Sequence, residues 1–507
     1  MEGEDQGSGS RRTKGSSSRG SRRDRRAKGE KGEERSSRKR PAQKYGSQQG
    51  CWVTMLMMCS LIFVNGTMFL TFSQVDELCV QHVYDVVGVL AAEYLCLVFL
   101  IMYPIGSILA NLITINHGMR QCVVTGGVLT ALGIFLRVMS TFPAMGGKAE
   151  GGYDCLLIGE VFAGMAQPML MNNILKLANY WFDSKERDWA TKYMYMSQPV
   201  GLAFGLIISA IITHRKCDQN LLAWIYLTEL FLAIAATGWA YLKFKSKPAR
   251  PPSRSNEQMI KTTQDHLKKA SLPNFMLKET LWVLKNPNFI FLMLSFAFLM
   301  SLIYGLLAAA AVDTLIIDYN FSRKDMVLFL SVTAAGGMFG IYVYGGFLAV
   351  MPSYHPMRKI GYLLSIPTVL FFDWWLDDST AKCGTVGFFV LGMTLLPLLP
   401  ITLETAAEIT YDVPFEFVSG IMFSFGYLFT IGTYFMMTKI PPAKIDFFML
   451  TPWYKLICLC LAGAAASFSI LAFGKYNRRH VDEYGSADRG VTKPLMADAE
   501  GNATSEV

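Results

Sequence analysis

The chain has 507 residues, of which 52% are hydrophobic, and a positive mean hydropathy of +0.31. This composition excludes an ordinary water-soluble enzyme, and the length is sufficient for about a dozen membrane-spanning helices of roughly 20 residues each. The formal net charge of +8 arises within residues 1–50, which hold 15 Lys and Arg against 7 Asp and Glu, whereas the remaining residues are balanced.

Residues 1–50 consist mainly of Ser, Gly, Arg and Lys, with Tyr45 as their one aromatic residue. Such a segment buries too little apolar surface to offset the entropy lost on ordering, so we expect a disordered tail. It also lacks the apolar core of a signal peptide. Because a predicted membrane span follows at once, the basic clusters favour attraction to anionic lipids of the cytosolic leaflet, and we expect no nucleic-acid partner.

Apolar runs of spanning length predict an all-α polytopic membrane protein with 12 transmembrane helices, near residues 52–74, 85–112, 121–141, 155–181, 190–212, 222–243, 288–312, 326–349, 360–377, 384–409, 417–438 and 453–474. These spans form two sets of six around a basic segment that contains Pro248, Pro251 and Pro252. The predicted organisation is therefore a basic cytosolic tail (1–50), an N-terminal six-helix bundle (51–243), a cytosolic linker (244–287) with a mildly amphipathic piece at 276–284, a C-terminal six-helix bundle (288–474) and a cytosolic C-terminal tail (475–507).

The distribution of Lys and Arg among the loops predicts that both termini are cytosolic, since positive charge accumulates on the cytosolic side. This topology places the sequon at Asn320 in a short outer loop, so Asn320 is a candidate glycosylation site. We expect an integral membrane protein of the plasma membrane, with an endolysosomal or other internal membrane as the alternative.

Six polar and aromatic side chains lie near the midpoints of predicted spans: Asn65, Phe69, Gln167, Gln198, Tyr304 and Tyr427. The amides would be costly if they faced lipid, so they are expected to face a cavity or to form hydrogen bonds between helices. The aromatic residues either pack in the core or form a box whose electronegative ring faces hold an ammonium group. We take all six as candidate substrate-binding residues.

Three charged residues, Glu93, Arg137 and Glu160, fall in the outer third of predicted spans two, three and four. The simpler interpretation is a buried ion-pair cluster that stabilises the N-terminal bundle. If a proton is coupled to transport, a carboxylate of this set is the first candidate for its site.

Glycines recur at helix-packing spacing, as in Gly201-x-x-x-Gly205 of predicted span five and Gly336-x-x-x-Gly340 of predicted span eight. Predicted span eleven also contains Gly420. Small residues at this spacing let helix backbones approach closely. They indicate either static packing or surfaces along which helices slide as two bundles rock.

Glu404 and Glu408 lie four residues apart, on one face of predicted span ten. A carboxylate inside a membrane needs a partner, a proton or water. Because the span ends near residue 409, the pair is expected at the cytosolic rim rather than at the bilayer midplane. We interpret it as an inner gate whose basic partner is Arg120, Arg358 or Lys359.

No segment offers a nucleotide-binding loop, a catalytic triad or the spacing of metal ligands. We therefore expect no catalytic residues, no metal and no cofactor, and the chain is not predicted to be an enzyme.

Two segments resemble a known family. One runs from Ala166-Gln-Pro to Tyr180-Trp-Phe-Asp-Ser-Lys-Glu186, and the other is Leu399-Pro-x-x-x-Glu404-x-x-x-Glu408-x-Thr-Tyr411 followed by Ser419-Gly420. They are similar to segments of the feline leukaemia virus subgroup C receptor-related family, within the major facilitator superfamily. The resemblance covers roughly residues 52–474. It implies two six-helix bundles, alternating access, and a solute such as choline, ethanolamine, heme or a vitamin.

The chain also departs from that pattern. The loop at Leu112–Gly118 lacks the acid that is usual in the superfamily, and the corresponding corner after predicted span eight reads Phe347-Leu-Ala349. Choline-transporting relatives have a Trp near the position of Phe69 and a Gln near that of Tyr427.

The sequence therefore predicts a monomeric transporter of a small organic solute, with a choline- or ethanolamine-like amine as the first choice. The alternative solutes are heme or a vitamin-like molecule such as pyridoxine. The alternative class is a non-transporting receptor or sensor on the same scaffold, with the basic tail as its interaction module.

Overall fold

The computed structural model divides the chain into a unit of residues 1–45 and a unit of residues 46–507, and the residues it describes belong to the second unit. The described residues are 50–69, 71, 83–84, 91–142, 151–214, 219–269, 272–311, 321–350, 353–377, 381–411, 413–439, 453–474, 478 and 482. Over these residues the regular secondary structure is helical, without strands, as expected for segments whose backbone must satisfy its own hydrogen bonds in lipid.

The helices before the linker form one group, the N-terminal group: α2 (Cys51–Phe69), α4 (Ala91–His117), α5 (Met119–Ser140), α6 (Gly151–Met171), α7 (Ile174–Trp181), α8 (Arg187–His214) and α9 (Gln219–Lys243). Within it, α2 packs on α8 and α9, α5 packs on α6 and α9, and α4 packs on α6. Their apolar side chains are buried on the faces that meet and exposed on the outer faces, as lipid requires.

The helices after the linker form the C-terminal group: α12 (Pro287–Ala311), α14 (Arg323–Val350), α15 (Tyr354–Asp377), α16 (Ala381–Leu395), α17 (Leu398–Ile409), α18 (Phe415–Lys439) and α19 (Trp453–Leu471). Here α14 packs on α16, α12 packs on α18 and α19, and α15 packs on α16 and α19. The two groups meet where α4 contacts α18 and α8 contacts α14.

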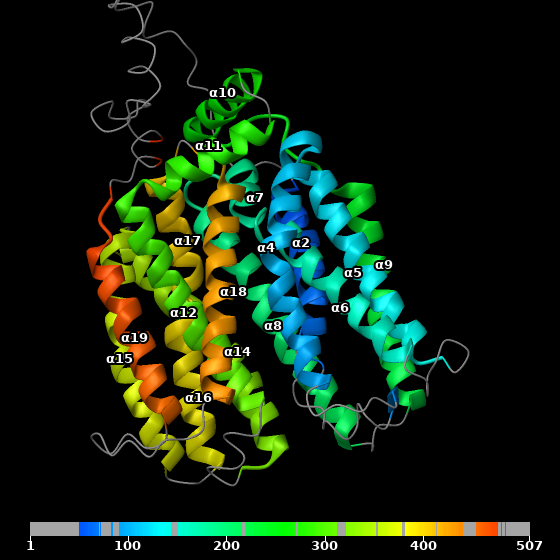
Figure 1. The fold of residues 1–507 in the computed structure, drawn as a ribbon. Helices are drawn as coiled ribbons and strands as arrows, with labels where there is room; N and C mark the ends of the chain where they lie inside the picture. The colour runs from blue at the N-terminus through cyan, green and yellow to red at the C-terminus, as the bar shows by residue number, and fades with distance from the viewer. Residues whose placement is uncertain are drawn as a thin grey trace, which may run out of the picture. The chain divides into compact units, whose positions relative to one another are not determined.

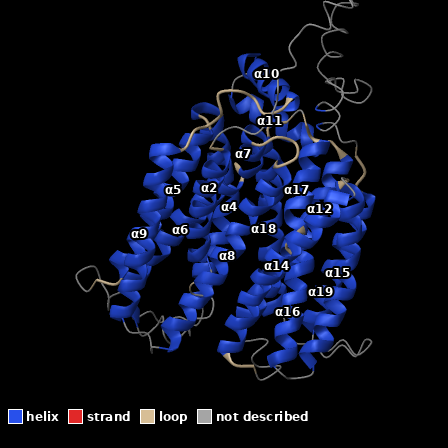
Figure 2. Cartoon of the chain, turned by 180° about the vertical axis from the view of Figure 1, so that it is seen from behind, coloured by secondary structure: helices blue, strands red, loops and turns tan. Residues whose placement is uncertain are grey.

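The linker contains two helices, α10 (Arg254–Lys269) and α11 (Leu272–Leu284). The second agrees with the amphipathic piece expected at 276–284, whereas a helix at α10 was not predicted. Both lie over one end of the two groups (Figures 1 and 2), which we call the linker end. The sequence predicts that this end is cytosolic.

Two predicted spans are broken rather than continuous. The span at 155–181 divides into α6 and α7 at Asn172 and Asn173, and the span at 384–409 divides into α16 and α17 at Leu396 and Pro397. Pro397 lacks a backbone donor and so interrupts the hydrogen-bond ladder. At the first break, the hydroxyl of Ser419 lies 3.0 Å from the carbonyl oxygen of Asn172. A backbone group of the N-terminal group thus finds its partner in the C-terminal group.

Among the described residues, ten helices are long and apolar enough to cross a membrane. The described part of α19 contains a shorter apolar stretch, Leu456–Leu471, and α15 is not among the ten. The chain is an integral membrane protein with many apolar helices, and the number of 12 spans stays a prediction.

The glycine motifs of α8 and α14 serve close packing inside each group. A Cβ at Gly201 would collide with the carbonyl oxygen of Phe63 on α2, and one at Gly340 would collide with that of Met393 on α16. Gly420 differs, because a Cβ there would lie 2.6 Å from the hydroxyl of Ser107 on α4, across the interface of the two groups. The static interpretation fits α8 and α14, and sliding between groups stays a prediction for Gly420.

We expect Gly201→Ala to destabilise the protein by about 1–3 kcal/mol, because the added methyl group forces the backbones of α2 and α8 apart. Thermal unfolding of the purified protein, followed by tryptophan fluorescence, measures the effect. The control is Gly238→Ala on α9, where an added Cβ meets nothing within 4 Å. That substitution removes a weak helix former and should leave the melting temperature unchanged or raise it. Equal melting temperatures for Gly201→Ala and wild type would contradict the packing argument.

Candidate functional site

Tyr427 on α18 is fully buried at the interface of the two groups. Its hydroxyl accepts hydrogen bonds from Nε2 of Gln167 at 2.9 Å and from Nε2 of Gln198 at 3.3 Å. Gln167 is on α6 and Gln198 is on α8, so the donors come from the N-terminal group and the acceptor from the C-terminal group. Three of the residues predicted near mid-depth therefore meet at one hydroxyl.

Further buried rings surround this hydroxyl. The ring centroids of Tyr103 and Tyr304 lie 4.5 and 5.8 Å from that of Tyr427, and Phe423 lies 6.3 Å away. Phe69 continues the set, at 6.2 Å from Tyr304. We call these five residues the aromatic cluster. It draws α2 and α4 of one group together with α12 and α18 of the other.

Two members of the aromatic cluster, Tyr103 and Phe423, were missed by the sequence analysis. A signal existed for Phe423, because it precedes Tyr427 by four residues and so lies on the same helix face. Tyr103 lies in the inner half of the predicted span 85–112, where nothing distinguishes it from other aromatic residues of the chain. Its place became evident only from the packing of α4 against α18.

Two polar atoms beside the aromatic cluster have no hydrogen-bond partner among the described residues. They are Oε1 of Gln167 and the hydroxyl oxygen of Tyr195, both buried. The ring of Tyr195 lies 5.9 Å from that of Phe423. Buried polar atoms in native proteins nearly always have a partner, so these two are available to a bound molecule.

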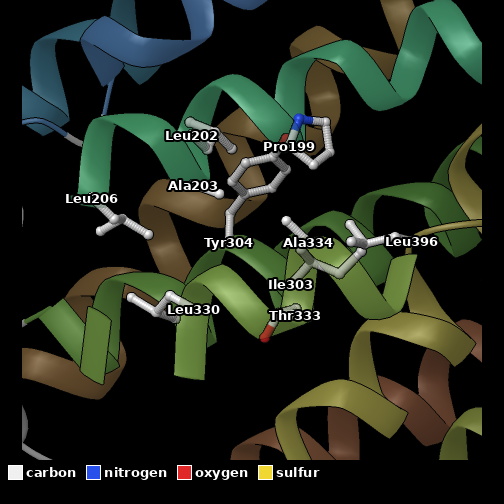
Figure 3. Close-up of a pocket in the computed structure, with 10 residues that line it drawn as sticks. All are labelled: Pro199, Leu202, Ala203, Leu206, Ile303, Tyr304, Leu330, Thr333, Ala334 and Leu396. Atoms are coloured by element: carbon white, nitrogen blue, oxygen red, sulfur yellow. The ribbon is translucent and has the colours of Figure 1, made fainter. Parts of the chain in front are cut away.

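An apolar pocket adjoins the aromatic cluster at Tyr304, whose ring lies between α8 and α14 in Figure 3. It opens between the two groups and is lined by Pro199, Leu202, Ala203, Leu206, Ile303, Tyr304, Leu330, Thr333, Ala334 and Leu396. No ionised side chain is among the lining residues. A solute held here meets ring faces, methyl groups and a few neutral polar atoms.

Asn65 was predicted to share this site, and the structure places its amide elsewhere. Its Nδ2 donates to Oγ1 of Thr130 at 3.1 Å and to the carbonyl oxygen of Ala163 at 3.0 Å. It thereby joins α2 to α5 and α6 inside the N-terminal group. The amide of Asn65 therefore forms hydrogen bonds between helices and does not face the aromatic cluster.

Glu404 and Glu408 share one basic partner, Arg478. Nη2 of Arg478 lies 2.7 Å from Oε2 of Glu404, and its Nε donates to Oε1 of Glu408 at 2.9 Å. Glu404 also accepts from the hydroxyl of Thr191 at 2.7 Å, and Arg478 donates from Nη1 to Oδ1 of Asn179 at 3.2 Å. The predicted carboxylate pair exists as a buried cross-link between the two groups, which we call the Arg478 joint.

The expected partners of this pair require correction. The guanidinium of Arg120 donates to the carbonyl oxygen of Tyr241 at 2.6 Å. The guanidinium of Arg358 donates to the carbonyl oxygen of Ser469 at 2.8 Å. The ammonium of Lys359 lies 3.7 Å from the ring centroid of Phe473. The salt bridge of Glu404 goes to Arg478, in the predicted C-terminal tail. Both glutamates are buried, with exposed fractions of 3% for Glu404 and 0% for Glu408.

The Arg478 joint continues to Asp482, four residues later in the sequence. Oδ2 of Asp482 lies 3.3 Å from Nη2 of Arg187, and its Oδ1 accepts from the backbone nitrogen of Ser255 in the linker at 2.8 Å. Burial raises the pKa of the Asp482 carboxyl, but Arg187 and the hydrogen bonds outweigh it and hold this pKa below its ordinary value. For Arg478, burial alone would lower the pKa, and the two glutamates raise it well above the ordinary value. Both residues are therefore charged at neutral pH.

Other contacts also close the linker end. The hydroxyl of Tyr411 donates to the carbonyl oxygen of Ser255 at 2.6 Å, and Lys176 of α7 forms an ion pair with Glu416 of α18. The N-terminal group, the linker, the C-terminal group and residues 478 and 482 are thus connected at this end.

Two of the charged residues predicted in the outer third, Arg137 and Glu160, lie at the end opposite the linker. Nε of Arg137 donates to Oε1 of Glu160 at 2.8 Å, which confirms their ion pair. The structure adds Glu229 of α9, with Oε2 at 3.7 Å from Nη1 of Arg137. The side chain of Glu93 and the glycosylation candidate Asn320 lie outside the described residues.

Comparison with known proteins gives a consistent result. The sequence model of the Major Facilitator Superfamily matches residues 50–434. The chain is 23% identical over 406 residues to the human "Choline/ethanolamine transporter FLVCR2", covering 75% of this chain and 71% of that one. It is 22% identical to the "Choline/ethanolamine transporter FLVCR1" of Felis catus (81% and 72% covered) and 25% identical to "Solute carrier family 49 member A3" of Xenopus tropicalis (74% of each).

Solved structures share the fold. The proton:xylose symporter XylE superposes with a TM-score of 0.59 at 12% identity, covering 86% of this chain and 96% of that one. The transporter FucP superposes with a TM-score of 0.57 at 12% identity, covering 84% of this chain and 100% of that one.

We expect Tyr427→Phe to lower the free energy of unfolding by about 1–3 kcal/mol, because it leaves the amide donors of Gln167 and Gln198 without their buried acceptor. Thermal unfolding in detergent measures the change. Tyr94→Phe is the matched control, since Tyr94 is 54% exposed and its hydroxyl should contribute less than about 0.5 kcal/mol. Equal effects of the two substitutions would show that the shared hydroxyl does not join the groups.

We expect Arg478→Gln to destabilise the closed linker end by about 3–5 kcal/mol, because Glu404 and Glu408 then lose their buried cation. In a cysteine-depleted background, cysteines introduced at Lys185 and Pro356 carry spin labels. Double electron–electron resonance between the labels then measures the separation of the two groups. The variant should shift the distance distribution to longer values.

Two further variants test the cause of that shift. Combining Arg478→Gln with Glu404→Gln and Glu408→Gln removes all three charges and should restore much of the closed population. Lys261→Gln breaks an exposed linker ion pair, in which Lys261 is 69% exposed, and should leave the distances unchanged. An unchanged distribution in Arg478→Gln would contradict a closing role for the Arg478 joint.

Proposed function

Because the chain belongs to the Major Facilitator Superfamily, we propose that it is an alternating-access transporter of a small organic ammonium solute of the choline or ethanolamine kind. The observation that carries this proposal is the aromatic cluster, where buried rings from both helix groups surround polar atoms that lack hydrogen-bond partners. Sites between two such groups are exposed to either side of the membrane in turn when the groups rock.

The chemistry of the aromatic cluster favours a cation without requiring a carboxylate. The faces of Tyr103, Tyr304 and Tyr427 carry negative electrostatic potential, which attracts an ammonium group most strongly where water is excluded. Oε1 of Gln167 and the hydroxyl of Tyr195 suit the hydroxyl group that both choline and ethanolamine carry. Apolar walls beside Tyr304 suit the methyl groups of choline.

The similar transporters of human and cat bear names that state choline and ethanolamine as their solutes. At Phe69, where choline-transporting relatives have a Trp, this chain keeps an aromatic side chain, and at Tyr427 it has a ring in place of a Gln. Both rings belong to the aromatic cluster. An anionic solute such as heme finds no basic side chain among the residues of the cluster or the pocket. These observations support the amine over the other solutes.

The proposed state of this structure is one in which the linker end is closed. The Arg478 joint, the Lys176–Glu416 pair and the Tyr411–Ser255 hydrogen bond all lie there. Given the predicted topology, the solute would reach the aromatic cluster from the non-cytosolic side, and loss of the Arg478 joint would open the cytosolic side. A plasma-membrane location is part of this proposal.

The test is uptake of radiolabelled choline and ethanolamine by proteoliposomes that contain the purified protein. Tyr304→Leu removes one ring face and should weaken apparent affinity by about 2- to 30-fold, as cation–π energies of about 0.5–2 kcal/mol imply. Phe298→Leu removes a ring from the same helix that packs on Phe429 and Phe468 instead, and should change affinity little. 3,3-Dimethylbutan-1-ol, the uncharged isostere of choline, should compete poorly.

Three outcomes would contradict this proposal. Uptake of pyridoxine or heme without uptake of either amine would reassign the solute. Equal competition by choline and its uncharged isostere would exclude cation recognition by the rings. Loss of uptake on deletion of residues 1–45 would favour a sensor whose basic tail is its interaction module. A transporter should retain uptake without that separate unit.

A further inference from the structure

The end of the N-terminal group opposite the linker contains a second buried ionic cluster, formed by Arg137, Glu160 and Glu229. Their exposed fractions are 0%, 1% and 4%. Arg137 contacts Glu160 through both Nε and Nη2, whereas Glu229 approaches only Nη1, at 3.7 Å. The three residues come from α5, α6 and α9 and therefore hold three helices together.

The charges of this cluster do not balance when both carboxylates are ionised. One guanidinium then faces two carboxylates, and the excess negative charge lies where water is scarce. Glu229 is the poorly satisfied member, because neither of its oxygens has a hydrogen-bond partner among the described residues. A buried carboxylate in this condition takes up a proton, which removes the cost of burying its charge.

The Arg478 joint also has one guanidinium and two carboxylates, but its carboxylates have more hydrogen-bond donors around them. Glu404 accepts hydrogen bonds from Thr191 and Arg478, and Glu408 accepts one from Arg478. Hydrogen bonds of this kind stabilise the ionised form of a carboxylate. The second cluster differs because, in the part of the chain that the structure describes, no donor forms a hydrogen bond with either oxygen of Glu229.

Among the described residues, four titratable side chains surround Glu229. Arg137 comes from α5, Glu160 from α6 and Tyr226 from its own helix, with the Arg137 guanidinium 5.9 Å from the ring centroid of Tyr226. The fourth, Tyr84, packs in the same buried cluster as Tyr226, and its hydroxyl lies 3.2 Å from that of Ser140. Helix α2 carries no charged side chain, and α8 packs apolar residues such as Ile208 against this region. A metal cation would need several ligands, and among the described residues no group of three or more His, Cys, Asp or Glu side chains could hold one. The surroundings therefore suit a proton better than a metal cation.

The cluster is also connected to the aromatic cluster. Nη2 of Arg137 donates to the carbonyl oxygen of Met68 at 2.6 Å, near the end of α2. The next residue is Phe69, whose ring packs against those of Phe99 and Tyr304. If Glu229 loses its proton, the guanidinium is drawn toward a second carboxylate, which weakens its hold on Met68 and hence on Phe69.

We propose that Glu229 is a proton-binding site that is occupied in this structure, and that its proton is coupled to solute binding through Arg137, Met68 and Phe69. The coupling part of the inference rests on the proposed function, whereas proton binding by Glu229 does not. Because coupling is reciprocal, a proton that favours solute binding must itself bind more tightly when the solute is present.

Infrared difference spectroscopy of the purified full-length protein at neutral pH tests proton binding without any solute. Wild type should show the carbonyl band of a protonated carboxylic acid, and Glu229→Gln should lack it. Glu160→Gln should also lack it, because Arg137 then balances Glu229 alone. Glu416→Gln is the matched control, a buried glutamate already paired with Lys176, and should retain the band. A full band in Glu229→Gln, or its loss from wild type on adding sodium chloride, would overturn the proposal.

Choline binding, followed by isothermal titration across pH, tests the coupling. Wild-type affinity should fall at least about fivefold as pH rises through the titration of Glu229, since deprotonation loosens Phe69. Glu229→Gln should keep the low-pH affinity throughout, and Glu229→Asp should retain a pH dependence. Identical pH profiles for wild type and Glu229→Gln would overturn the coupling. Absence of choline binding at every pH in wild type would contradict the proposed solute, and the infrared result would still decide whether Glu229 holds a proton.

Discussion

The need to pair charges that are removed from water governs this protein more than any other constraint. A membrane-spanning chain cannot rely on solvent to satisfy a buried carboxylate, so each one requires a cation, hydrogen-bond donors or a proton. Arg478 meets this need for Glu404 and Glu408, and in doing so it connects the end of α17 to Asn179 of α7. The closed linker end depends on a residue beyond the last predicted span, because Arg478 supplies the positive charge that pairs with both glutamates.

The broken helices follow from the same constraint applied to the backbone. Interrupting α6 and α16 frees carbonyl groups that lipid cannot satisfy, so the breaks have to lie where another helix supplies a donor. Ser419 does so for Asn172 from across the interface, and Tyr103 donates to the side chain of Asn172 at 2.8 Å. Tyr103 belongs to the aromatic cluster as well. The break, the interface and the proposed binding site are thus connected through shared side chains.

The sequence was sufficient for the helical fold, because apolar runs of spanning length have few alternatives in a membrane. It also indicated that Gln167, Gln198 and Tyr427 face the protein interior, because polar groups at mid-depth avoid lipid, and the structure brings these three together. Their role in substrate binding stays a prediction. The sequence could not identify Arg478 as the partner of the glutamates, since 74 residues separate Arg478 from Glu404 and nothing in the pattern links a tail to a span. Nor could it separate Asn65 from the other amides. That distinction depends on how α2, α5 and α6 are rotated about their axes, because the rotation brings Thr130 and the carbonyl oxygen of Ala163 within hydrogen-bond distance of the Asn65 amide.

The two ionic clusters differ in a way that suits a transporter of alternating access. At the linker end, hydrogen bonds satisfy both carboxylates, so the charged state is stable and the groups stay joined. At the opposite end, neither oxygen of Glu229 has a hydrogen-bond partner among the described residues, so its charge is costly and, under the proposal, its protonation follows the proton concentration on that side of the membrane. Phe69 lies one residue from the carbonyl that Arg137 holds, which puts a ring of the aromatic cluster within reach of that change. Under the proposed coupling, the aromatic cluster responds to the proton on Glu229 through Arg137 and Met68, without direct contact between the proton and the solute.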